Sequence, residues 1–307
     1  MSMQRITQRS ISQSSLAGLQ TNLGRLAKVQ EQLSSGRVLN RPSDSPSGTV
    51  AAMTFRSETS AAEQHVRSAE DGQSWLNTIG GKLMAMQDGV NKANELAVQG
   101  LSTGSSSAQV REALAAQVDG IRAGLLDDAN STYLGRPVFG GVTAGSIAYQ
   151  GDGSYVGTAP PAVGTLNPPA VVRTVGPGTK VRVDITGQET FSSPTDPSRN
   201  LFTVLGEISA SLKNDSVGLG PLLTELSSVQ ETMRTGIADV GARMNHVDGA
   251  LQTARDAVIH LTDSLAEVES TDVAAAIVEM KLGEMSYQAA LAATSRAIQP
   301  SLVDWLR

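Results

Sequence analysis

A run of apolar residues between positions 237 and 268 constrains the fold more than any other part of the sequence. Apolar side chains recur there at alternating steps of three and four, the spacing that keeps one face of an α-helix apolar: Ile237, Val240, Met244, Val247, Leu251, Ala254, Val258, Leu261, Leu265 and Val268. At a rise of about 1.5 Å per residue this stretch would form a helix roughly 48 Å long. A helix of that length needs a partner along all of it, so the sequence predicts paired long helices.

Other stripes of the same kind supply the partners. One runs from Leu76 to Gly100, and a return helix follows from Val110 to Leu125 after a predicted turn at 102–107. A leucine stripe near the N-terminus consists of Leu16, Leu19, Leu23, Leu26 and Leu33. After a register slip at Glu269 to Asp272, a C-terminal stripe continues through Val273, Ile277, Met280, Tyr287, Leu291 and Ile298.

The stretch between the leucine stripe and the second helix predicts a structured hinge loop. Gly36 suits the position after a helix end because it tolerates a left-handed backbone. Pro42 and Pro46 are expected to prevent the helix from resuming at once, and Ser43 and Asp44 offer side-chain oxygens for turns and caps. The next helix is expected to begin near Thr49.

Residues 141–199 differ from the rest because they are rich in Gly, Pro and Thr, and Ala170 to Val175 and Lys180 to Thr186 read as short strands. The predicted fold is therefore mainly α, with long antiparallel coiled-coil helices from both chain termini and a small inserted β-rich domain. We expect a terminal helical assembly domain of residues 1–42 plus 269–307, a helical core domain of 43–140 plus 200–268, and an inserted β domain of 141–199. The insert is expected to be dispensable for assembly.

Composition excludes several functions. Aromatic residues make up 3% of the chain, which favours an aliphatic helical core over a ligand pocket. A net charge of −6 argues against nonspecific nucleic-acid binding, and the lack of cysteine excludes disulfides and thiolate chemistry. The histidines lack metal-ligand spacing, so we expect no metal, cofactor or catalytic site. Neither a secretory signal nor a membrane-spanning stretch is present, so we expect no membrane insertion.

Charge is distributed unevenly between the two ends. Residues 1–41 carry six basic side chains and one acid, a net of +5, whereas residues 248–284 carry eight acids and two bases, a net of −6. Chance asymmetry of two solvated faces would explain this, because surface ion pairs are individually weak. We prefer the interpretation that the terminal helices lie against each other, within or between subunits.

Three stretches together resemble the flagellin and hook-associated protein family of bacterial flagella. They are the loop with Ser35-Gly36-Arg37, Pro42-Ser43-Asp44 and Pro46; the hairpin from ANELAVQG to GRPVFGG; and the C-terminal stretch from Val268 to Arg307. The resemblance implies a structural, non-enzymatic protein that assembles through its terminal helices. It assigns subunit assembly to the leucine stripe, and assembly or chaperone contact to Ile277, Met280, Tyr287, Leu291, Ile298, Leu302, Trp305 and Leu306.

Within that family, Val240 to Asn245 and the ending Ser301 to Arg307 favour a ring-forming adaptor that joins hook to filament. The implied partners are further copies of the chain, hook-associated protein 1 on the hook side, flagellin on the filament side, the flagellar export apparatus and an export chaperone. The implied location is the extracellular flagellum, reached without a cleaved signal peptide. Two alternatives stay open: a flagellin subunit of the filament itself, and an unrelated secreted coiled-coil adhesin or translocator.

Overall fold

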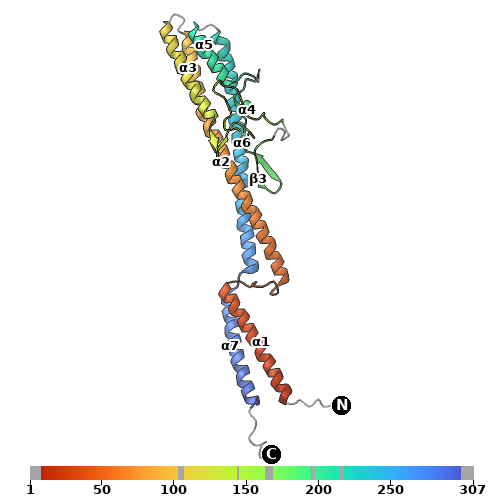
Figure 1. The fold of residues 1–307 in the computed structure, drawn as a ribbon. Coiled ribbons are helices and arrows are strands. Elements are labelled where there is room, and N and C mark those ends of the chain that lie inside the picture. Colours follow the sequence, from red (N-terminus) through yellow and green to blue (C-terminus); the bar gives the residue numbers. More distant parts are fainter. Residues whose placement is uncertain are drawn as a thin grey trace, which may run out of the picture. The chain divides into compact units, whose positions relative to one another are not determined.

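The structure is a computed structural model that describes residues 8–102, 107–143, 145–162, 169–194, 196, 198–214 and 218–298. Helices dominate it (Figure 1), as the apolar periodicity predicts. The helices are α1 (Gln8–Ser35), α2 (Pro46–Ser102), α3 (Ala108–Ala129), α4 (Gly187–Phe191), α5 (Leu201–Lys213), α6 (Leu219–Glu269) and α7 (Val273–Ile298). Two antiparallel hairpins are formed by β1 (Thr132–Tyr133) with β2 (Arg136–Pro137), and by β3 (Val172–Gly176) with β4 (Thr179–Arg182).

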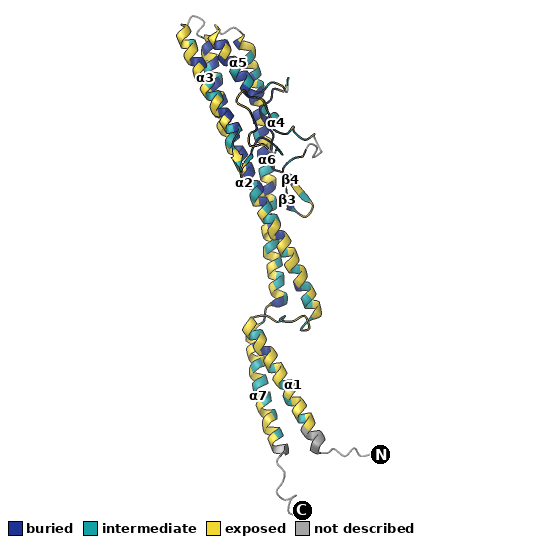
Figure 2. Cartoon of the chain, viewed as in Figure 1, coloured by how far each residue is buried: buried dark blue, intermediate teal, exposed yellow. Residues whose placement is uncertain are grey.

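The chain divides into two compact units. The terminal unit holds the described residues of 1–60 and 258–307, and the central unit holds those of 61–257. Helices α2 and α6 contribute residues to both units. Buried positions are concentrated in the central unit, whereas few occur on α1 and α7 (Figure 2). The three domains expected from the sequence stay a prediction.

The apolar stripes of α2 and α6 form the core of the central unit. On α2 the fully buried positions are Leu76, Ile79, Leu83, Met86, Val90, Ala93 and Ala97, and on α6 Val240, Val247, Leu251 and Ala254 are buried. Gln73 of α2 donates a hydrogen bond to Asp248 of α6 at 2.5 Å, and Gln230 of α6 donates to Asn91 of α2 at 3.1 Å. The two helices therefore lie side by side with the predicted faces inward.

Helix α3 returns along α2, which confirms the predicted hairpin. The ammonium group of Lys82 lies 2.7 Å from Asp128, and a side chain at Gly89 of α2 would meet Leu125 of α3 at 3.0 Å. Helix α5 also packs against α3, where Ser209 donates to the carbonyl of Ala115. The middle of the predicted turn, 103–106, lies outside the described residues.

Aromatic side chains form a second part of this core, which the composition did not predict. The ring centroids of Tyr149 and Phe202 are 4.7 Å apart, and those of Phe139 and Phe191 are 5.1 Å apart. All four side chains are buried, and Phe202 comes from α5. The segment between β2 and α5 therefore shares one hydrophobic core with the helices, because its rings reach across to them.

A buried polar cluster also ties this segment to α6. Arg182 forms hydrogen bonds with Asp184 and with both carboxylate oxygens of Glu189, at 2.6–2.8 Å. Arg243 of α6 donates to the carbonyl of Asp184 at 2.6 Å. Burial opposes ionisation of Glu189, but hydrogen bonds from Arg182 and Thr186 outweigh it and hold the pKa of Glu189 below its ordinary value of 4.5.

Candidate assembly interface

In the terminal unit, α1 and α7 pack as an antiparallel pair with a narrow apolar seam (Figure 1). Val29 of α1 and Ala276 of α7 are the buried apolar side chains of the two helices among the residues described. Leu26 lies against Gly283, where a Cβ atom would meet it at 3.6 Å. Leu19, Leu26 and Leu33 are half-buried on α1, as are Met280 and Tyr287 on α7. Small residues on α7 thus admit the leucines of α1.

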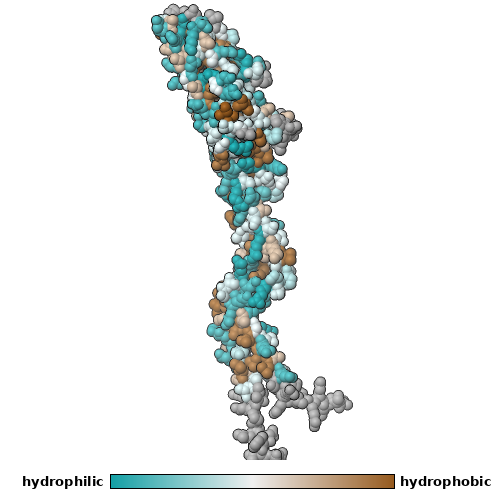
Figure 3. Space-filling model, viewed as in Figure 1, coloured by the Kyte–Doolittle hydropathy of each residue, from teal (hydrophilic) through white to brown (hydrophobic). Residues whose placement is uncertain are grey.

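Other apolar side chains of the same helices face outward. On α1 Leu16 and Leu23 are 52% and 50% exposed, and on α7 the set is Val273, Ile277, Val278, Leu282, Met285 and Leu291, between 45% and 60% exposed. Figure 3 shows patches of hydrophobic residues on the visible face of the terminal unit. An exposed apolar stripe of this extent is typical of a protein interaction surface.

The structure therefore divides the predicted assembly residues into two groups. Leu19, Leu26, Leu33, Met280 and Tyr287 lie toward the seam within the chain. Leu16, Leu23, Ile277 and Leu291 are exposed in the single chain, so they remain available for contact with another subunit. Ile298 ends α7, and Leu302, Trp305 and Leu306 lie outside the described residues. Their roles in assembly stay predictions.

The hinge loop between α1 and α2 begins as predicted. Gly36 has a φ of +70°, and its N–H donates to the carbonyl of Gln32 at 2.8 Å, which ends α1. Asp44 accepts hydrogen bonds from Lys28 and from the N–H of Arg41. These bonds, with that from Lys28 the strongest contribution, lower the pKa of Asp44.

The start of α2 corrects one expectation about this loop. The helix begins at Pro46 and not near Thr49. Ser45 precedes it and accepts a hydrogen bond from the N–H of Gly48 at 3.1 Å. Proline is favoured in the first turn of a helix, because the N–H that it lacks would have no partner within the helix there. Pro42 and Ser43 remain exposed in the loop, as expected.

Glu269, the last residue of α6, anchors the hinge loop, a role that the sequence did not predict. Its carbonyl accepts a hydrogen bond from the N–H of Val38 at 2.8 Å. Its carboxylate is nearly buried, with 8% of the side chain exposed, and lies 2.5 Å from Arg56 and 3.8 Å from Arg37. The uneven charge of the two chain ends was the available signal, but it did not single out this pair of arginines.

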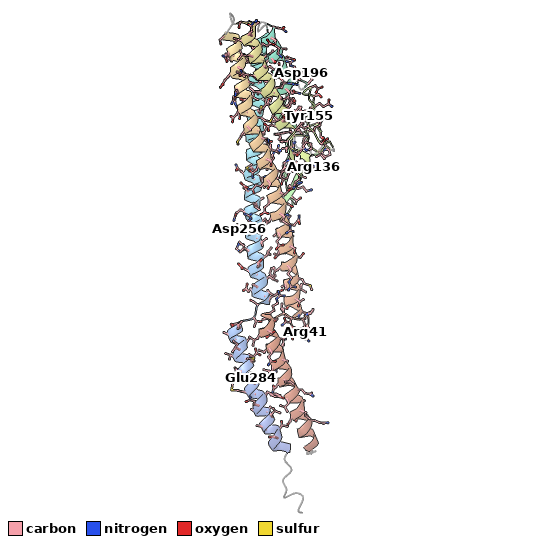
Figure 4. All side chains as sticks on the ribbon, turned by 60° about the vertical axis from the view of Figure 1, so that its left-hand side comes forward. Arg41, Arg136, Tyr155, Asp196, Asp256 and Glu284 are labelled. Atoms are coloured by element: carbon pink, nitrogen blue, oxygen red, sulfur yellow. The ribbon has the colours of Figure 1, made fainter. Side chains whose placement is uncertain are left out.

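Apolar contact, and not charge, joins α1 to α7. Among the charged side chains that the structure describes, none of α1 forms an ion pair with one of α7. Figure 4 places Arg41 in the hinge loop and Glu284 on α7. Arg41 pairs with Glu31 at 3.4 Å, and Glu284 pairs with Lys281 on its own helix at 2.9 Å. The terminal helices do lie against each other, as we preferred from the charge distribution. Apolar packing holds them together, and not the opposite net charges of the two chain ends.

A bound metal ion would need a cluster of ligating side chains in the described part of the chain. His, Asp and Glu side chains do not gather in groups of three or more that would hold a metal ion in this part of the chain. Among the helices that the structure describes, none combines the length and apolar character needed to cross a bilayer. The terminal unit presents an exposed apolar surface on a pair of helices. This feature is typical of helical proteins that assemble with other subunits.

Comparisons with known proteins agree with that class. Residues 6–143 match the family described as the bacterial flagellin N-terminal helical region. The flagellar filament 31.3 kDa core protein of Treponema maltophilum is 38% identical over 79 residues, which are 26% of this chain and 27% of that protein. The chain thus matches about a quarter of the length of this curated relative.

Solved structures share the fold. A protein of Vibrio parahaemolyticus described as a flagellar hook-associated protein has a TM-score of 0.65 at 16% identity, and the match covers 74% of this chain and all of that one. FlgL of Bacillus cereus has a TM-score of 0.56 at 21% identity, covering 71% of this chain and 100% of that chain. Flagellar hook associated protein-3 of Legionella pneumophila has a TM-score of 0.59 at 14% identity, and the match covers 70% of this chain and 98% of that one. Over residues 6–143 the chain therefore resembles the flagellin N-terminal family, and it shares the fold of the hook-associated proteins.

Proposed function

We propose that this protein is a structural adaptor of the bacterial flagellum that joins the hook to the filament, forming a ring at their junction. One observation carries the proposal: the terminal unit leaves apolar stripes of both α1 and α7 uncovered, in a fold shared with hook-associated proteins. Burying those stripes requires neighbouring subunits, since the terminal unit itself covers only one seam. Each exposed Leu or Ile gains about 1.5–3 kcal/mol when fully buried, less the part already covered.

In this account the chain catalyses no reaction and needs no cofactor. Its terminal helices stack on those of successive copies, on hook-associated protein 1 toward the hook and on flagellin toward the filament. The protein leaves the cell through the flagellar export apparatus, without a cleaved signal peptide. An export chaperone covers the C-terminal apolar residues, from Ile277 to Leu306, before assembly.

A flagellin of the filament is the second candidate, because the curated relative is a filament core protein. The two functions differ in consequence. Loss of a junction adaptor leaves flagellin itself intact but removes its place of attachment, so flagellin is secreted without polymerising, whereas loss of flagellin removes the filament subunit itself.

Deletion of the gene tests the proposal. Electron microscopy of the deletion strain should show hooks without filaments, and the culture supernatant should contain unpolymerised flagellin. Expression of the wild-type chain from a plasmid should restore filaments and clear the supernatant. Normal filaments in the deletion strain would refute the proposal, and absence of any flagellin from both fractions would favour the second candidate.

A further inference from the structure

The hinge loop encloses a basic cavity in the terminal unit. It has a volume of about 280 Å³ and is lined by Arg37, Leu39, Asn40, Arg41, Pro42, Thr49, Ala52, Met53, Arg56 and Glu269. Three guanidinium groups and one carboxylate lie in this lining, and the remaining wall is largely apolar. Such a site suits a ligand that combines an acidic group with apolar surface.

The charges within the cavity are not balanced. Glu269 faces two arginines, Arg56 at 2.5 Å and Arg37 at 3.8 Å, so one carboxylate stands against two guanidinium groups. Arg41 has only an exposed partner, Glu31, which does not line the cavity. Exposed pairs of that kind contribute at most about 1 kcal/mol, so Arg41 is free to exchange its partner.

The last turns of α6 carry the complementary surface. Ile259, Asp263 and Glu267 are spaced four residues apart and are all exposed, Ile259 by 58%. Neither Asp263 nor Glu267 has an ion-pair partner among the described residues. Residues two apart on a helix point about 200° apart, so Glu267 faces away from the cavity that Glu269 lines. The acidic stripe of Ile259, Asp263 and Glu267 is therefore available to another molecule.

We propose that the hinge cavity of one subunit receives the acidic stripe of a neighbouring copy of this chain. Asp263 and Glu267 pair with Arg41 and the other guanidinium groups, and Ile259 covers the apolar wall near Met53. The contact joins two different surfaces, so it is heterologous and generates a ring or a helical array instead of a closed dimer. This inference rests on the proposed function, to which it adds the lateral contact between subunits.

Cysteine cross-linking tests the contact directly, because the chain contains no cysteine of its own. Met53→Cys and Asp263→Cys chains, each with a different tag, are expressed together, and isolated flagella are treated with a short bismaleimide. We expect a cross-linked species that carries both tags. The control replaces Met53→Cys with Met84→Cys, at a residue of similar exposure in the central unit, and should give none. Dimers carrying one tag only, or equal cross-linking of the control, would overturn the inference.

Charge reversal gives a second measurement that needs no cysteine. Asp263→Lys with Glu267→Lys should lower the amount of chain in sheared flagella by about tenfold or more. Addition of Arg41→Glu to the same chain should restore most of it. Glu95→Lys is the matched control, since Glu95 is an exposed acid of the central unit without an ion-pair partner in the described residues, and it should have no effect. Unchanged incorporation of the double variant would contradict the inference.

The two proposals fail in distinguishable ways. If wild-type chain is found at the junction but neither cross-linking nor charge reversal behaves as expected, the lateral contact is wrong and the adaptor function stands. If the deletion strain bears normal filaments, the adaptor function is wrong whatever the cross-linking shows.

Discussion

Truncation of two exposed side chains of α7 should weaken assembly without unfolding the monomer. Ile277 and Leu291 are each 45% exposed, so somewhat less than half of each side chain is left to bury between subunits. Full burial of such a residue is worth about 1.5–3 kcal/mol, so about 0.7–1.3 kcal/mol remains available at each site. The double variant Ile277→Ala, Leu291→Ala should therefore lose about 1.5–2.5 kcal/mol per subunit contact, or roughly a 10- to 70-fold loss of affinity.

The assay compares variant protein in sheared flagella with that in the culture supernatant, by quantitative immunoblot. Far-UV circular dichroism of the purified monomers should show nearly unchanged helix content. Arg25→Gln and Glu284→Gln serve as controls, because exposed charges contribute at most about 1 kcal/mol. The reasoning would be refuted if the charge variants stayed in the supernatant while the double alanine variant was incorporated normally.

Further predictions concern the central unit and the hinge. Phe191→Ala removes a fully buried ring from the aromatic cluster and should cost about 3–5 kcal/mol in urea unfolding of the monomer, whereas equal stability would show that the cluster is not packed. Because the pKa of Glu189 is lower in the folded protein than its ordinary value of 4.5, the Glu189 carboxylate stabilises the fold at pH values above 4.5. This stabilisation should be lost as the pH falls from 4.5 through the lower pKa of the folded state, and Glu189→Gln should remove this pH dependence of the unfolding free energy. Gly36→Ala places a side chain at a φ of +70°, which L-residues rarely adopt, and should lower the free energy of local unfolding at the last turn of α1 by about 1 kcal/mol, as measured by hydrogen exchange. Gly24→Ala is the control and should cause no such loss, because its Cβ would meet no neighbouring atom. Replacement of residues 143–198 by a Gly/Ser linker should destabilise the central unit, because it removes Tyr149 and Phe191 from the shared core, and unchanged stability would contradict this. That the insert is dispensable for assembly stays a prediction, which the motility of the same variant tests.

Periodicity predicted the helices well but could not say what covers each face. In the central unit the stripe of α6 pairs with α2 of the same chain, so Val240, Val247, Leu251 and Ala254 are buried, whereas the remaining stripe residues are half-buried. On α1, Val29 is buried while Leu16 and Leu23 are not, because a single partner helix covers only one narrow seam. An apolar stripe has the same spacing whether its partner lies in the same chain or in another subunit.

The hinge and the insert depended on contacts between distant residues. Glu269 seemed only to interrupt a stripe, and its arginine partners lie more than 200 positions away in sequence, at Arg37 and Arg56. The low aromatic content favoured an aliphatic core, yet the few rings present gather at one place around Tyr149. Composition gives an average over the chain and carries no information about such placement.

Immunogold labelling of intact flagella distinguishes a junction adaptor from a filament subunit. Antibodies against the purified chain should label a narrow band where the hook meets the filament, with a deletion strain as the negative control. Uniform label along the filament would contradict the adaptor function and show that the chain is a filament subunit.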